Sequence, residues 1–157
     1  MWLQQDLAIL GRVVAAMALG GLIGLERETR AKPAGLRTHM LVAGAAALIV
    51  GLGDVLAETF MREDYAGILQ VDPVRLIEAV IACVGFIGAG TILRSASHDH
   101  VLGLTTAVSL LMAAAIGIAT GLARYGLGIG VAVLSLLVLV VFSHLERKLP
   151  RQEPPKD

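Results

Sequence analysis

The sequence predicts an all-α, polytopic membrane protein with five transmembrane helices. Of its 157 residues, 56% are hydrophobic, and the mean hydropathy of +0.77 is well above that of an ordinary soluble domain. Eighteen glycines and only 4% aromatic residues favour the same class, because small residues let membrane helices approach closely. A buried soluble bundle would need polar outer faces, whereas the apolar stretches of this chain are apolar around their whole circumference.

Five apolar stretches reach or approach the roughly 20 residues that a bilayer-spanning helix needs. The predicted spans are residues 7–25, 38–57, 74–93, 104–122 and 127–145, within a transmembrane domain that covers residues 1–149. The second and fourth spans are rich in alanine and glycine, so we expect them to face other helices. The fifth is the most apolar, which suits a helix that faces lipid. Residues 150–157 are polar and proline-rich, and are predicted to form a disordered cytosolic tail.

Single residues refine this pattern. Arg12 lies near enough to the start of the first span for its side chain to reach the membrane interface. Asp72 is predicted to cap the third helix, with Pro73 as its first residue. Arg75 and Glu78 follow with the i, i+3 spacing of a helical ion pair.

Orientation is predicted from the distribution of positive charge. With five spans, nine of the 13 Lys and Arg residues fall on the side that holds the first connection and the C-terminus. That side is therefore expected to be cytosolic, which places the N-terminus outside. Total Lys and Arg equal total Asp and Glu, so net charge gives no reason to expect a nucleic-acid partner.

The chain contains a repeat. Gly21-Leu-Ile-Gly24 closes the first span, and Gly85-Phe-Ile-Gly88 lies near the end of the third. Gly35-Leu-Arg-Thr38 opens the second span, as Gly103-Leu-Thr-Thr106 opens the fourth, and a triple alanine follows each. The sequence therefore predicts two parallel helix-pair repeats plus a fifth helix, related by an axis along the membrane normal. Both polar connections would then lie near the cytosolic face.

The first connection, residues 26–39, is called the first elbow below and concentrates the charges of the chain. Glu26 directly follows the first span, where an ionisable group is costly and often functional. Glu26 and Glu28 with loop carbonyls could hold a partly hydrated cation such as magnesium. The other interpretation is an ion pair of Glu26 with Arg30, at i, i+4, or with Arg37.

Thr38 stands where an N-cap of the second span is expected, flanked by Arg37 and His39. A helix N-terminus beside an arginine outlines an anion site. The simpler interpretation is that Thr38 only caps, while Arg37 pairs with Glu26 or Glu28. Thr105 and Thr106 repeat the capping arrangement without the arginine.

No catalytic motif is visible, so no enzymatic activity and no cofactor are predicted. Gly20–Gly24, Gly117–Gly121 and Gly126–Gly130 each have the G-x-x-x-G spacing of close helix contacts, within the bundle or between copies of the chain. The expected partners are the lipid bilayer, a second copy in a homodimer, and another membrane protein.

The motif GLIGLERETRAKPAGLRTHMLVAGAAAL in residues 21–48 resembles the membrane domain of the MgtC/SapB family. Asp72-Pro-Val-Arg75, VGFIGAGTIL, GLTTAVSL and AAIG follow in the family's order, so the resemblance covers nearly all of residues 7–145. By this resemblance, the motif positions that carry function include Glu26, Arg27, Glu28, Pro33, Arg37, Thr38, His39, Asp72, Arg75, Thr105 and Thr106, with the glycines Gly35, Gly85, Gly88 and Gly90. These four glycines, together with Gly24 and Gly103, are expected to have structural roles.

The resemblance implies a bacterial inner-membrane protein linked to magnesium homeostasis and growth in low magnesium. Some members resemble proteins that regulate other membrane proteins, F-type ATP synthase among them, more than they resemble pumps. The alternative is a transporter or ion-binding protein for Mg²⁺ or a small anion, with its site between the repeats. The chain departs from the pattern at Ala79, Cys83 and Leu111, where the family often has Gln, Gly and Trp. The soluble C-terminal domain of many members is also not expected here.

Overall fold

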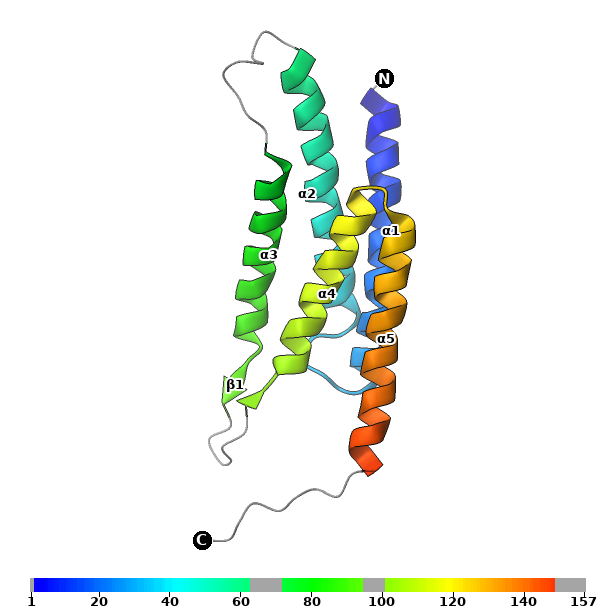
Figure 1. Ribbon diagram of the computed structural model, residues 1–157, viewed down its shortest axis with the longest axis vertical. Coiled ribbons are helices and arrows are strands. Elements are labelled where there is room, and N and C mark those ends of the chain that lie inside the picture. The colour runs from blue at the N-terminus through cyan, green and yellow to red at the C-terminus, as the bar shows by residue number, and fades with distance from the viewer. Residues whose placement is uncertain (1, 63–71, 95–100, 149–157) are drawn as a thin grey trace.

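The computed structural model describes residues 2–62, 72–94 and 101–148, which form an elongated helical bundle (Figure 1). The helices are α1 (Trp2–Thr29), α2 (Leu36–Arg62), α3 (Pro73–Gly90), α4 (Leu104–Gly121) and α5 (Tyr125–Lys148). Between α3 and α4, β1 (Leu93–Arg94) pairs with β2 (Val101–Leu102) as a two-residue antiparallel ribbon. The predicted all-α class is confirmed, while the tail predicted at residues 150–157 lies outside the described residues.

Among the described residues, four helical segments are long and apolar enough to cross a membrane: α1, Leu36–Ala57 of α2, α4 and Tyr125–Ser143 of α5. Of these, α4 is the most buried within the bundle and α5 the least. The predicted packing of the fourth span against other helices is therefore confirmed, and α5 is exposed on most of its surface, as a lipid-facing helix would be. The predicted third span corresponds to α3, which is not among these four segments. It has 18 residues and ends at Gly90, three residues before the predicted limit, because the chain enters the ribbon at Leu93.

Two alanines with positive φ close α1 and α4. The N–H of Lys32 donates to the carbonyl of Arg27 and that of Ala31 to Glu28, at 3.0 and 2.9 Å. This is a Schellman motif, in which Ala31 takes the left-handed conformation with φ of 52°. Ala123, with φ of 58°, ends α4 through the same pair of bonds. These motifs satisfy carbonyls at the helix ends and let short connections reverse the chain.

Glycines bring α1 and α4 against the two sides of α2. A Cβ on Gly117 of α4 would overlap the carbonyl oxygen of Ala43, and one on Gly20 of α1 would lie 2.6 Å from the Ala43 Cβ. Of the three G-x-x-x-G pairs, Gly20–Gly24 and Gly117–Gly121 thus mark contacts within the bundle. The pair at Gly126 and Gly130 has nothing within 4 Å of either added Cβ.

The predicted repeat is visible in the chain path. In Figure 1 α1 and α3 run in one direction, α2 and α4 return, and both connections lie at the same end of the bundle. Gly24 packs against Leu36 and His39, and Gly88 packs against Ala107 in the same way. Ala34 of the first elbow also belongs to an apolar cluster with residues of α3 and α4. The two repeats are therefore packed together at this end.

The glycines expected to be structural divide into two groups. Gly24, Gly35 and Gly88 lie close to neighbouring atoms, and Gly103 has φ of 92°, which favours glycine. Gly85 and Gly90 have nothing within 4 Å of an added Cβ. For these two the expectation is wrong within a single copy of the chain, because their side of α3 faces outward.

Candidate functional site at the first elbow

The charged residues at the end of α1 form a compact, buried ion cluster. The Glu26 side chain is only 9% exposed and that of Arg27 only 3%. Glu26 Oε2 accepts a hydrogen bond from Arg27 Nε at 2.5 Å, while Oε1 pairs with Arg30 Nε. The predicted i, i+4 pair with Arg30 is confirmed. The alternative pair with Arg37 is not formed, because both oxygens of Glu26 already face the other two arginines.

The side chain of Glu28, two residues after Glu26, lies at the N-terminus of α2. The N–H of Leu36 donates to Glu28 Oε2 at 2.8 Å, and a Cβ on Gly35 would lie 2.7 Å from that oxygen. The helix begins at Leu36, so the prediction that Thr38 is its N-cap is wrong. A carboxylate from the preceding helix takes the capping position instead, which places a negative charge where the helix dipole favours one. Arg37 is exposed beside it.

His39 joins the first elbow to α4. Its side chain is fully buried, with Nδ1 2.9 Å from the Gly35 carbonyl and Nε2 3.0 Å from Ser109 Oγ. A carbonyl oxygen can only accept, so Nδ1 donates to Gly35, while Nε2 lies within hydrogen-bond distance of the Ser109 hydroxyl. Ser109 Oγ also lies 2.8 Å from the Thr106 carbonyl. Ser109 was not predicted, and the signal that could have found it is its i+3 spacing from Thr106 on the buried face of α4.

Thr105 and Thr106 do not cap α4 as predicted. The N-cap is Gly103, and no side chain bonds to the start of the helix. Thr105 is exposed, whereas Thr106 is 2% exposed and points into the bundle. Only Thr106 therefore belongs near His39.

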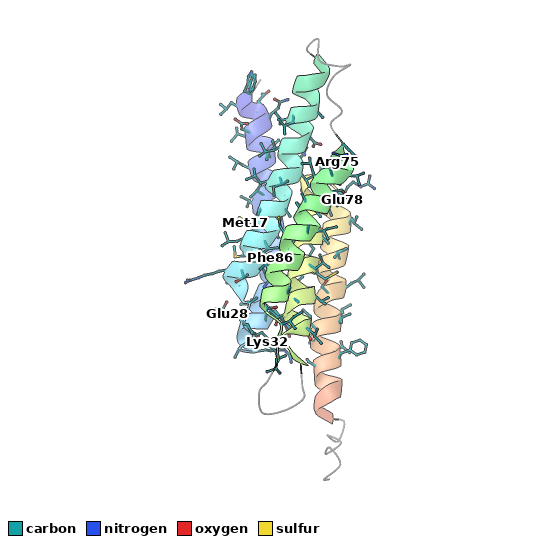
Figure 2. The ribbon with its side chains drawn as sticks, turned by 90° about the vertical axis from the view of Figure 1, so that its left-hand side faces the viewer. Met17, Glu28, Lys32, Arg75, Glu78 and Phe86 are labelled. Atoms are coloured by element: carbon teal, nitrogen blue, oxygen red, sulfur yellow. The ribbon has the colours of Figure 1, made fainter. Side chains whose placement is uncertain are left out.

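The start of α3, with Asp72 and Arg75, lies at the other end of the bundle from the first elbow (Figure 1), and Figure 2 shows Arg75 far from Glu28 and Lys32. Asp72 caps α3 by accepting from the N–H of Val74 at 2.9 Å, and Pro73 is the first helical residue, as predicted. The ion pair of Arg75 is with Asp72, at 3.9 Å, instead of with Glu78. The residues that the resemblance groups together therefore lie in two separate regions of the molecule.

A second polar contact, near the start of α1, was missed. Arg12 Nη1 donates to Asp54 Oδ2 at 2.9 Å and to the carbonyl of Gly121 at 2.8 Å. The Arg12 side chain, which was predicted to reach the membrane interface, instead links α1, α2 and the end of α4 through these two hydrogen bonds. A cavity of about 60 Å³, lined in part by Asp54, lies next to it. The available signal was that Arg12 and Asp54 are the only Asp, Glu, Lys or Arg in the first two predicted spans.

A metal site assembled from side chains is absent from the described residues. No three His, Cys, Asp or Glu side chains within residues 2–62, 72–94 and 101–148 lie close enough to hold a metal ion together. The first elbow instead offers a neutralised acidic residue, a buried histidine bridge and an exposed rim that includes Lys32 and Arg37.

Comparison with protein families decides the relationship. The model of the MgtC family matches residues 13–148. This chain belongs to the MgtC family. It is 42% identical over 146 residues to an Escherichia coli K12 protein named "Putative magnesium transporter YhiD", covering 90% of the chain and 63% of that relative. No solved structure matches the chain.

Other members extend the comparison. SapB of Bacillus subtilis is 41% identical over 120 residues, which are 76% of this chain and 50% of that protein. MgtC of Salmonella typhimurium LT2 is 32% identical over 137 residues, which are 87% and 53%. The chain therefore spans between half and two thirds of the length of these relatives. Together with its apolar helices, the family membership makes this MgtC-family chain a multi-pass bacterial membrane protein.

Proposed function

We propose that this MgtC-family chain acts in magnesium-related physiology of the bacterial inner membrane, by binding and regulating another membrane protein. It would neither catalyse a reaction nor carry the ion itself. The link to magnesium is supported by the name of the YhiD relative, with which the chain shares 42% identity. The mode of action is argued from the first elbow.

The observation that carries the proposal is the pairing of Glu26. A site that binds and releases Mg²⁺ needs carboxylate or carbonyl oxygens that a hydrated cation can reach. The Glu26 side chain is only 9% exposed, and both of its oxygens face arginines, with Nε of Arg27 at 2.5 Å from one of them. Two cationic neighbours of one carboxylate repel a divalent cation. This arrangement suits a structural ion cluster that shapes the elbow.

The exposed rim of the elbow is the surface that a partner would contact. Lys32, Pro33 and Arg37 are exposed around the buried cluster, and His39 fixes the elbow to α4 from below. A rim of charged side chains on a rigid support is suited to selective recognition of a partner protein.

Transport of Mg²⁺ is the second candidate, favoured by the name of the YhiD relative. It requires Glu26 to leave its arginines during a transport cycle and to face a water-filled path. The two candidates therefore differ in what Glu26 does, and one experiment separates them.

The purified chain is reconstituted in liposomes that contain a magnesium-sensitive dye. We expect no Mg²⁺ uptake beyond that of protein-free liposomes, and we expect affinity purification from cross-linked native membranes to recover one stoichiometric membrane protein. Lys32→Ala with Arg37→Ala should weaken that recovery, while Asp6→Asn, an exposed change at the far end of α1, should not. Uptake that is abolished by Glu26→Gln and kept by Asp6→Asn would establish transport and refute regulation.

A further inference from the structure

Helix α3 packs against the rest of the molecule through one side only. Val80 and Val84 are buried, and an added Cβ on Gly88 would lie 3.3 Å from Ala107 of α4. The opposite side of α3 is exposed along its length, and α3 forms the outer edge of the bundle in Figure 1. The question is what this outward side contacts in a membrane.

The outward side carries a regular stripe of residues, which we name the outer seam. Its members are separated alternately by four and three residues, the spacing that keeps side chains on one line when two helices pair. They are Arg75, Ala79, Ala82, Phe86 and Ala89, all exposed. Phe86 is 83% exposed, and Figure 2 shows it further along the same helix from Arg75 and Glu78.

The outer seam is composed mostly of small residues. Three of its five members are alanines, whereas large aliphatic side chains such as Leu134, Leu137 and Val138 dominate the outward face of α5, each at least half exposed. Helix α1 also has an exposed line of small residues, Ala8, Gly11 and Ala18, but that line carries no pair of complementary charges. Alanine contributes little contact with lipid, but it lets the backbone of another membrane helix approach closely.

Charge gives a second, independent indication. The Arg75 side chain is 84% exposed, and its ion pair with Asp72 is long, at 3.9 Å. Glu78 is exposed at the margin of the seam, and no hydrogen bond or ion pair of Glu78 is found within the described part of the chain. Complementary charges along a pair of helices set which helices associate and in which orientation. Here the complementary charges are three residues apart on the same helix.

From this geometry we propose that the outer seam is the interface of a homodimer, in which α3 packs in parallel against α3 of a second copy. A two-fold axis along the membrane normal makes each contact occur twice. Arg75 of each copy then lies beside Glu78 of the other, one helical turn along, so the seam complements its own charges. Phe86 of each copy fills the space above the small residues of the other copy. The same contact gives a role to Gly85, which has no close neighbour in the single chain.

Disulfide cross-linking tests the proposal directly. Ala82→Cys is made with Cys83→Ser, which removes the single native cysteine, and native membranes are treated with a mild oxidant. Most of the chain should migrate as a covalent dimer. Ala18→Cys in the same background is the matched control, because Ala18 is an exposed alanine on the outward side of α1. It should stay monomeric on denaturing gels.

Charge reversal adds a measurement that does not depend on a disulfide. Arg75→Glu or Glu78→Arg alone should weaken self-association in liposomes about tenfold, the change expected for one or two lost interhelical polar contacts. The double variant Arg75→Glu with Glu78→Arg should restore it, because the pair is exchanged across the axis. Equal cross-linking at Ala82 and Ala18, a monomer in liposomes, or cross-linking of Ala82→Cys only to a different protein would each overturn the proposal. The Mg²⁺ uptake and affinity-purification results do not affect this test.

Discussion

Within a helical membrane bundle, a buried polar side chain has few alternatives to the partners that the fold provides. His39 is fully buried and has one partner at each ring nitrogen, the Gly35 carbonyl and Ser109 Oγ. Ser109→Ala would leave Nε2 without a partner in a dry site, at a cost of about 1–3 kcal/mol in the free energy of unfolding. We expect a clearly lower midpoint of thermal unfolding in detergent.

Ser143→Ala is the matched control for this prediction. Ser143 Oγ also bonds to a carbonyl three residues back, that of Val140, but it does so on the exposed side of α5. Its removal should leave the midpoint nearly unchanged. Equal effects of the two alanine variants would show that the bridge between His39 and α4 contributes little to stability.

At the scale of helices, the bundle depends on the closeness of α4 to α2. Gly117→Ala places a methyl group against the backbone carbonyl of Ala43, which cannot move aside like a flexible side chain. Overpacking of this kind costs about 1–3 kcal/mol, so we expect a destabilised protein that unfolds at lower temperature or in milder detergent.

Gly130→Ala makes the same chemical change on α5, where nothing lies within 4 Å of the new methyl group. Because alanine favours a helix over glycine, this variant should be neutral or slightly stabilised. If Gly117→Ala were as stable as Gly130→Ala, the close contact between α2 and α4 would not exist as described.

The helix boundaries show which features the sequence could predict. Apolar length and glycine content were enough for the class, the number of helices and the repeat, because these depend on local composition. Asp72 and Pro73 were correctly assigned because this cap is made by adjacent residues. Thr38 was wrongly assigned because the group that caps α2 is Glu28, eight residues earlier, and it reaches Leu36 only after the elbow has folded.

The same distinction applies to the candidate site. The pair of Glu26 with Arg30 is local to one helix and was found among the alternatives. The contacts His39–Ser109 and Arg12–Asp54 join residues 70 and 42 positions apart, so they depend on how the helices pack. Sequence patterns alone give residue types at such sites but not their partners.

At the scale of the whole molecule, the remaining question is which end faces the cytosol. The first elbow, the ribbon between α3 and α4, and the last described residues of α5 all lie at one end, and the start of α1 lies at the other (Figure 1). In the topology predicted from the sequence, nine of the 13 Lys and Arg residues fall on the side of the membrane that holds the elbow and the C-terminus. Positive residues in short connections are retained on the cytosolic side, so we predict a cytosolic elbow and an external N-terminus.

Cysteine labelling tests this orientation. Lys32→Cys and Gln4→Cys are each made with Cys83→Ser, since both positions are exposed and lie at opposite ends of the α1–α2 hairpin. A membrane-impermeant maleimide should label Gln4→Cys in intact spheroplasts, and should label Lys32→Cys only after the membrane is permeabilised. The reversed pattern would invert the topology and place the Glu26 cluster at the external face. Labelling of both positions from one side would contradict the crossing of the membrane by α1, on which the hairpin repeat, the buried elbow and the α3 interface all depend.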